Sequence, residues 1–198
     1  MRRCSILSAL LIAASAVTLN AVNVGISGSA GGSGDSLLDS GGTPIPASTL
    51  GLLLVDASGN GISFQPGVTL NVGTFLSGGD DDFLVAKLSS SDVFGTSFID
   101  FDETVDNDGV NLMTGDQYYV AWFPGLTTAA TSLTAGQDYG LTTRTIATAW
   151  TLPPTGNNLG DAAPGGNANL TVVPEPSTYA AIAGLFGLGV IALRRFRK

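Results

Sequence analysis

Residues 51–61 read GLLLVDASGNG, and this short stretch gives the clearest indication of the fold class. Its four consecutive apolar residues end in a cluster of Asp, Ser, Gly and Asn, which are the residues that form turns. Short runs of the same kind, rich in Val, Leu, Thr and aromatic residues, recur at residues 68–76, 83–88, 96–101, 118–123, 139–146, 147–152 and 169–173. Runs of this length predict strands, and their spacing favours two packed sheets. The sequence therefore predicts an all-β domain, an antiparallel and jelly-roll-like β-sandwich, with a closed barrel as the alternative.

Glycine-rich segments help to place the limits of this predicted domain. We expect the sandwich to cover residues 22–155. Residues 156–173 are rich in Gly, Asn and Ala and contain Pro164, which predicts a linker between the domain and the C-terminal segment. Residues 25–42 are rich in Gly and Ser, so this part of the domain is expected to be flexible.

Two amino-acid counts exclude several kinds of active site. The chain of 198 residues has no histidine, and its one cysteine is Cys4. Ser-His-Asp and Cys-His catalysis both need an imidazole base, and zinc sites need imidazole or several thiolates. A single cysteine also excludes a disulfide within the chain. A carboxylate-based hydrolase needs only two acids, but nothing else in the sequence supports one. We therefore predict a protein that is not an enzyme and has no cofactor, with calcium as the one candidate ion.

The charged residues are divided unevenly along the chain. All 16 acidic residues lie between Asp35 and Glu175, whereas only Lys87 and Arg144 of the eight basic residues lie in that range. Nucleic acids and anionic membrane surfaces attract clustered lysine and arginine, so the acidic body predicts neither as a partner.

The N-terminus has the layout of a secretory signal. Arg2 and Arg3 precede an apolar run over residues 6–17, and small residues follow it. A basic start, a short apolar segment and a small-residue cleavage site are typical of export signals. The sequence therefore predicts a signal peptide over residues 1–21, helical in its apolar part, with cleavage after Ala16 or Ala21 as the two alternatives.

The C-terminus has three parts in a fixed order. Pro174, Glu175 and Pro176 come first, and residues 178–193 then form an uncharged, mostly apolar run. A helix of that length would reach about 24 Å, which is a little short of a bilayer core of about 30 Å. Basic residues close the chain at Arg194, Arg195, Arg197 and Lys198. The pattern predicts a single transmembrane helix with its basic end in the cytoplasm.

Together these three parts resemble a PEP-CTERM sorting signal, found on exported bacterial proteins that the membrane protease exosortase processes. The resemblance covers residues 173–198. It implies that Pro174, Glu175 and Pro176 are the sorting motif, with processing at or near them, and that the basic residues act as the stop. It further implies a transient anchor in the inner membrane and delivery to the cell surface or to the extracellular polysaccharide of a biofilm. A permanent single-pass anchor that follows a proline-rich linker is the alternative.

Trp122 and Trp150 offer two interpretations of the body. Both lie in runs that predict strands. Aromatic side chains in β-domains mostly fill the core, but exposed ones can also stack against sugar rings. The body is therefore expected to be a non-catalytic structural or adhesive domain, with a glycan-binding module as the alternative.

An acidic segment supplies the candidate ion site. Asp100, Asp102, Asp106 and Asp108 lie close together in the chain, and calcium prefers six to eight oxygen ligands. The spacing does not match an EF-hand loop, because Thr104 and Gly115 occupy the positions where acids are needed. Asp100 and Asp102 are expected to share one face of a strand. Solvated turns and an irregular calcium site are the two alternatives.

Overall fold

The computed structural model describes residues 21–31, 35–76, 81–144 and 149–174. Within these ranges the chain forms twelve β-strands and no helix, so the all-β prediction is confirmed. The same residues contain no helix long and apolar enough to cross a membrane. The predicted signal helix and the predicted C-terminal transmembrane helix lie outside the described residues.

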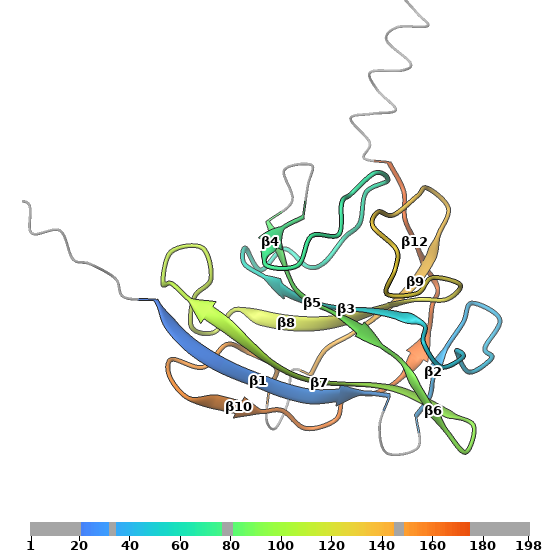
Figure 1. The fold of residues 1–198 in the computed structure, drawn as a ribbon, viewed down its shortest axis with the longest axis horizontal. Helices are drawn as coiled ribbons and strands as arrows, with labels where there is room; N and C mark the ends of the chain where they lie inside the picture. The colour runs from blue at the N-terminus through green and yellow to red at the C-terminus, as the bar shows by residue number, and fades with distance from the viewer. Residues whose placement is uncertain (1–20, 32–34, 77–80, 145–148, 175–198) are drawn as a thin grey trace, which may run out of the picture.

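Two main sheets and a small third one make up the fold. The strands are β1 (Val22–Ala30), β2 (Leu37–Leu38), β3 (Leu50–Asp56), β4 (Thr74–Phe75), β5 (Asp82–Ser89), β6 (Ser91–Val93), β7 (Thr96–Asn107), β8 (Gln117–Phe123), β9 (Asp138–Thr142), β10 (Asn157–Leu159), β11 (Gly166–Asn167) and β12 (Leu170–Thr171). One sheet has the order β10-β1-β7-β6, the second has the order β12-β9-β8-β3-β5-β4, and β11 pairs with β2. The pairs β1–β10 and β11–β2 are parallel, and the others are antiparallel. Figure 1 shows β1 and β7 forming one layer beside the layer of β3, β5 and β8.

Strand β3 is buried on both faces, which explains its unbroken apolar sequence. Strand side chains alternate between faces with a period of two. Leu53 and Val55 therefore point into a first core between the two sheets, whereas Leu52 and Leu54 point into a second core on the opposite face of the larger sheet. An antiparallel sheet that faced water would show apolar and polar residues in alternation instead.

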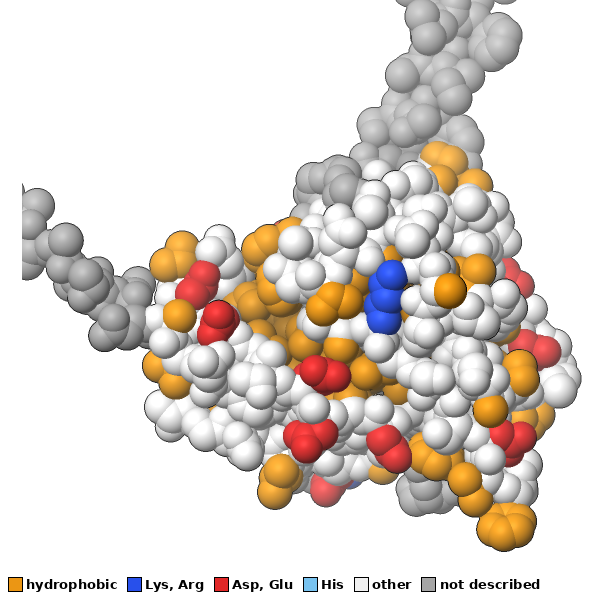
Figure 2. Space-filling view, in the orientation of Figure 1, with side chains coloured by type: hydrophobic (Ala, Val, Ile, Leu, Met, Phe, Trp, Pro, Cys, Tyr) orange, Lys and Arg blue, Asp and Glu red, His pale blue; other side chains and the backbone are white. Residues whose placement is uncertain are grey.

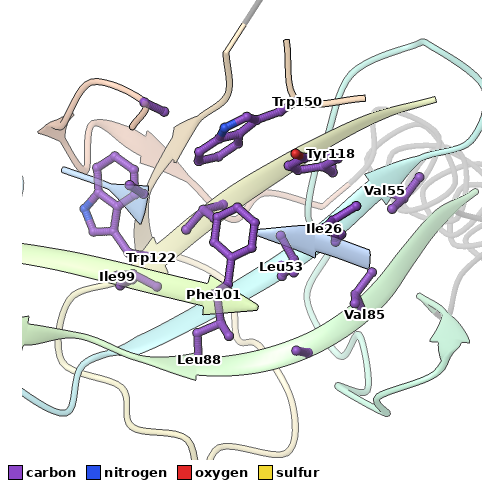
Figure 3. Packing of buried hydrophobic residues seen from close by; sticks show 14 of the residues in the cluster. Ile26, Leu53, Val55, Val85, Leu88, Ile99, Phe101, Tyr118, Trp122 and Trp150 are labelled. Atoms are coloured by element: carbon purple, nitrogen blue, oxygen red, sulfur yellow. The ribbon is translucent and has the colours of Figure 1, made fainter. Parts of the chain in front are cut away.

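Aromatic rings fill the first core (Figure 3). Trp150 stacks on Tyr118 with ring centroids 5.5 Å apart, and Phe101 meets the Trp150 ring edge-on at 5.0 Å. The indole N–H of Trp150 donates to the Asp161 carbonyl at 2.9 Å, and that of Trp122 donates to the Leu38 carbonyl at 3.0 Å. Both indole N–H groups are thus hydrogen-bonded inside the protein, as buried tryptophans require.

The second core lies between the larger sheet and the long loops that follow β3 and β8, with Leu76 directly after β4. Phe64, from the loop between β3 and β4, contacts Phe123 and Tyr139 edge-on, with centroid distances of 5.1 and 4.9 Å. Leu133, from the loop after β8, and Val172, directly after β12, complete the burial. The loops therefore act as a third layer, which a simple two-sheet sandwich would not require.

The segment predicted as a linker belongs instead to the folded body. Strand β10 pairs in parallel with β1, and Ala163, Ala168 and Val172 are buried in the cores. The small residues of this segment let its backbone lie close to the Trp150 ring. A Cβ on Gly160 would lie only 2.6 Å from the indole nitrogen of Trp150. The predicted boundary at residue 155 is therefore wrong, and the body extends to Val172.

The Gly/Ser-rich stretch at residues 25–42 also differs from its prediction in part. Its first residues belong to β1, which pairs with β7 along its whole length. Val24, Ile26 and Ala30 point into the first core, and Gly28 leaves room for Phe101 and Trp150. Gly28 thus makes room for large rings in the core. The sequence of β1 gives a weak strand signal because small residues occupy the positions next to those rings.

Candidate functional site: the point where the C-terminal segment leaves the body

Strand β12 fixes the chain immediately before the sorting motif. It pairs with β9 in antiparallel fashion, with Leu170 opposite Tyr139 and Thr171 opposite Asp138. The Val172 amide then donates to the Gln137 carbonyl at 2.9 Å, and the Val172 carbonyl accepts from Gly136 at 3.0 Å. Val172 is fully buried in the second core.

The chain becomes exposed directly after this point. The Val173 side chain is 57% exposed, and Pro174, the first residue of the sorting motif, is half-buried. The other predicted site residues of this region, which are Glu175, Pro176, Arg194, Arg195, Arg197 and Lys198, lie outside the described residues. The structure thus places one exposed residue between the last buried side chain and the motif.

The two tryptophans proposed as a glycan platform are both buried. Their side chains are at most 1% exposed, and their rings pack against other rings, glycines and strands of the first core. Neither ring has a face available to a sugar. The structure therefore corrects the glycan-platform interpretation of Trp122 and Trp150 in favour of a core role.

The four aspartates of the candidate calcium site do not form a common site. Asp100, Asp102 and Asp106 are exposed on the outer face of β7, as their alternation predicts, and Asp108 lies in the turn that follows. Throughout the described ranges, no three acidic or thiol side chains are arranged to hold a metal ion. On the face shown in Figure 2, acidic side chains are scattered as separate spots.

The Asp108 side chain stabilises the turn that follows β7. One of its carboxylate oxygens accepts the backbone N–H groups of Val110, Asn111 and Leu112 at 2.7–3.1 Å. These bonds, the one from Val110 above all, hold the pKa of the Asp108 carboxyl well below its usual range. The carboxylate closes a turn, which is the solvated-turn alternative.

A surface hollow at the end of β3 and the start of β8 contains two more acids. Asp56 accepts the N–H groups of Gly59 at 2.7 Å and Gly61 at 2.8 Å, and Asp116 accepts that of Met113 at 2.6 Å. Burial raises the pKa of Asp116, with a smaller contribution from the nearby Asp56 charge. Both carboxylates thus stabilise turns, and we assign the hollow a structural role.

Both basic side chains of the body are engaged in structural contacts. The Lys87 ammonium, on β5, donates to the Ala130 carbonyl in the loop after β8 at 2.6 Å. Arg144 donates to the Ala162 carbonyl at 2.5 Å and forms an ion pair with Asp161 at 3.3 Å. These two side chains therefore hold the loops that contain Ala130 and Asp161 in place.

Phe94 is a candidate contact residue that the sequence analysis missed. It occupies the two-residue turn between β6 and β7, it is fully exposed, and its φ is +54°. A bulky side chain in the left-handed region is strained, and hairpin turns of this kind favour Asn or Gly there. The signal in the sequence was Phe-Gly directly between two strand-like runs, but it is visible only once both strands are placed.

The comparisons with known proteins concern the C-terminal segment alone. Residues 172–198 match the family described as the PEP-CTERM protein-sorting motif. The chain matches no curated protein and no solved structure. A motif of this class indicates export as a membrane-anchored precursor that an exosortase processes. The chain therefore carries a PEP-CTERM protein-sorting motif, which begins at the residue where the folded body ends.

Proposed function

We propose that this chain is an exported protein whose C-terminal segment is cut by an exosortase-type membrane protease, after which the β-sandwich body stays at the cell surface or in the extracellular matrix. The proposal rests on the sorting motif matched at residues 172–198, whose first residue, Val172, is the last fully buried residue of the folded domain. The inner membrane holds the precursor only until the cut. The body itself acts as a structural or adhesive domain and performs no catalysis.

Several features of the body support a non-catalytic role. The sequence has no histidine, and its acidic residues outnumber its basic ones by 16 to 8. Asp56, Asp108 and Asp116 are used to close turns. A surface of Ser, Thr, Asn and Asp on a closely packed core suits a domain that must stay soluble and folded outside the cell.

Expression of the full chain with and without an exosortase-type protease tests the processing step. We expect the membrane fraction to hold the full-length precursor when the protease is absent, and a shorter form to leave that fraction when it is present. Changing Glu175 to alanine in the motif is expected to prevent the conversion. The proposal would be contradicted if the same amount of protein left the membrane fraction with and without the protease.

The tip of the β6–β7 hairpin is the surface that we propose for adhesive contact. Phe94 is fully exposed, and its neighbour Val93 is 49% exposed. Exposed aromatic side chains on rigid elements are typical binding anchors, because they bury a large area at little entropic cost. The strained backbone at Phe94 also costs stability, and such strain often marks a functional position.

The substitution Phe94→Asn separates adhesion from stability. Asparagine tolerates the left-handed region, so the free energy of unfolding is expected to rise by about 1 kcal/mol. Retention of the processed protein on cells is expected to fall, as measured by the ratio of surface-bound to released protein. Val110→Asn is the matched control, since it removes an exposed apolar side chain, 64% exposed, from a different loop. Unchanged retention of the Phe94→Asn variant would show that the tip is not the contact.

A further inference from the structure

The geometry at β12 points to a restriction on when the sorting motif can be cut. Residues 170 and 171 pair with β9, and the Val172 backbone bonds to Gly136 and Gln137, which directly precede β9. Thr171 adds a side-chain bond to Asp138 at 3.2 Å. Val172 is fully buried, and the Pro-Glu-Pro part of the sorting motif begins at Pro174. One residue, Val173, thus separates the last fixed position from the motif.

Such a short separation conflicts with the way that proteins bind peptide substrates. An extended peptide is commonly bound by main-chain hydrogen bonds on both sides of the recognised residues. The four residues that directly precede Pro174, the first residue of the Pro-Glu-Pro sequence, are 170–173. The backbone groups of three of these residues already bond to β9 or the adjoining loop. The same groups cannot bond to β9 and to a protease at the same time.

Strand β12 is well suited to leave the sheet by itself. It is an edge strand of two residues in which Leu170 is 41% exposed and Thr171 is exposed, so Val172 is the one fully buried side chain of residues 170–173. Edge segments with few buried contacts open locally, at a much smaller free-energy cost than unfolding of the whole domain. Proteolysis of a folded protein follows the population of such open states.

We propose that residues 170–172 must detach from β9 before the sorting motif is cut, so that the folded body sets the rate of its own release. This inference rests on the proposed function, because it concerns the same processing step. Opening also lengthens the stretch of sequence between the folded body and the predicted membrane segment. From Val172 to residue 178, where the apolar run begins, the chain spans at most about 20 Å. Release of β12 adds three more residues to that reach.

The experiment compares processing rates of full-length variants expressed with an exosortase-type protease, by pulse–chase of precursor into cut form. Val172→Ala removes two methyl groups from the fixed segment and is expected to speed cutting about tenfold. Val105→Ala removes the same groups from a buried position on β7, in the first core, and serves as the matched control. It is expected to leave the rate within about twofold of the wild type, because it does not loosen β12.

A spacer variant tests the same idea without weakening the fold. Six Gly and Ser residues inserted between Val173 and Pro174 give the protease free chain while β12 stays paired. This variant is expected to be cut at least as fast as Val172→Ala, and adding Val172→Ala to it should bring no further gain.

The outcomes separate this inference from the proposed function. Equal cutting rates for wild type, Val172→Ala and the spacer variant would overturn the requirement for strand release and leave processing itself intact. Equal acceleration by Val172→Ala and Val105→Ala would also overturn it, because global unfolding would then be the limiting event. No cutting of any variant, the spacer variant included, would contradict the proposed function and this inference with it.

Discussion

Replacing Trp150 by alanine is expected to lower the free energy of unfolding by about 3–5 kcal/mol. Trp150 has no exposed surface, and it stacks on Tyr118 while Phe101 contacts it edge-on. Its removal would leave a cavity between the sheets and an Asp161 carbonyl without its indole donor. Domains of this size are stable by only about 5–15 kcal/mol, so the variant is expected to lose much of its folded population at physiological temperature.

Urea unfolding followed by circular dichroism measures this loss. Trp150→Phe is the control, since it keeps a ring against Tyr118 and gives up only the indole hydrogen bond and part of the volume. Trp150→Phe is expected to lower the free energy of unfolding by clearly less than Trp150→Ala does. A loss below about 1 kcal/mol for Trp150→Ala would show that the ring cluster does not stabilise the first core as the packing indicates.

Replacing Gly140 by alanine is the second change with a large expected effect. Gly140 lies on β9 directly opposite Trp122 on β8. A Cβ at this position would overlap the six-membered ring of the Trp122 indole. The ring is buried and its N–H is bonded to the Leu38 carbonyl, so it has little freedom to move aside. Overpacking of this kind typically costs about 1–3 kcal/mol and can cost more.

Gly166→Ala provides a close comparison for this variant. Gly166 is also a strand residue, on β11, but a Cβ there would meet no atom within 4 Å. We expect the melting temperature to fall by several degrees for Gly140→Ala and to change little for Gly166→Ala. Equal melting temperatures for the two variants would contradict the close contact between Gly140 and Trp122.

The larger sheet was predictable because its central strands carry strong local signals. Runs of Leu and Val at β3 and β5, and of aromatic residues at β8, are flanked by Asp and Gly, so both the type and the approximate bounds of these strands follow from the sequence. The continuous apolar run of β3 fits its burial on two faces, which became apparent only in the structure. What covers its second face could not be predicted, because loops supply that layer and loop packing leaves no periodic pattern.

The strands made of small and polar residues were missed for a physical reason. β1 contains two glycines and β10 reads Asn-Asn-Leu, and such compositions are also typical of linkers. Their strand conformation depends on distant partners: β1 is held by β7 on one side and by β10 on the other. Local sequence carries no information about pairing over such separations.

Some candidate sites could be recognised from the sequence, whereas others depend on the fold. The sorting motif is a linear pattern, so Pro174, Glu175 and Pro176 are recognisable without any structure. The roles of Trp122 and Trp150 depend on which face of a strand meets the other sheet, and only the fold decides that. Phe94 was missed because a single phenylalanine beside a glycine says nothing about exposure until the hairpin is placed.

We propose that the body is released by a cut near the point where β12 leaves the fold. Intact-mass analysis and C-terminal sequencing of the protein from its native host, with membrane, surface and medium fractions kept separate, would show whether this cut occurs. We expect a surface or medium form that ends near residues 174–177 and lacks the basic residues Arg194 to Lys198. A form that keeps all residues to Lys198 and remains in the membrane fraction would contradict it, and would make the C-terminal segment a permanent anchor.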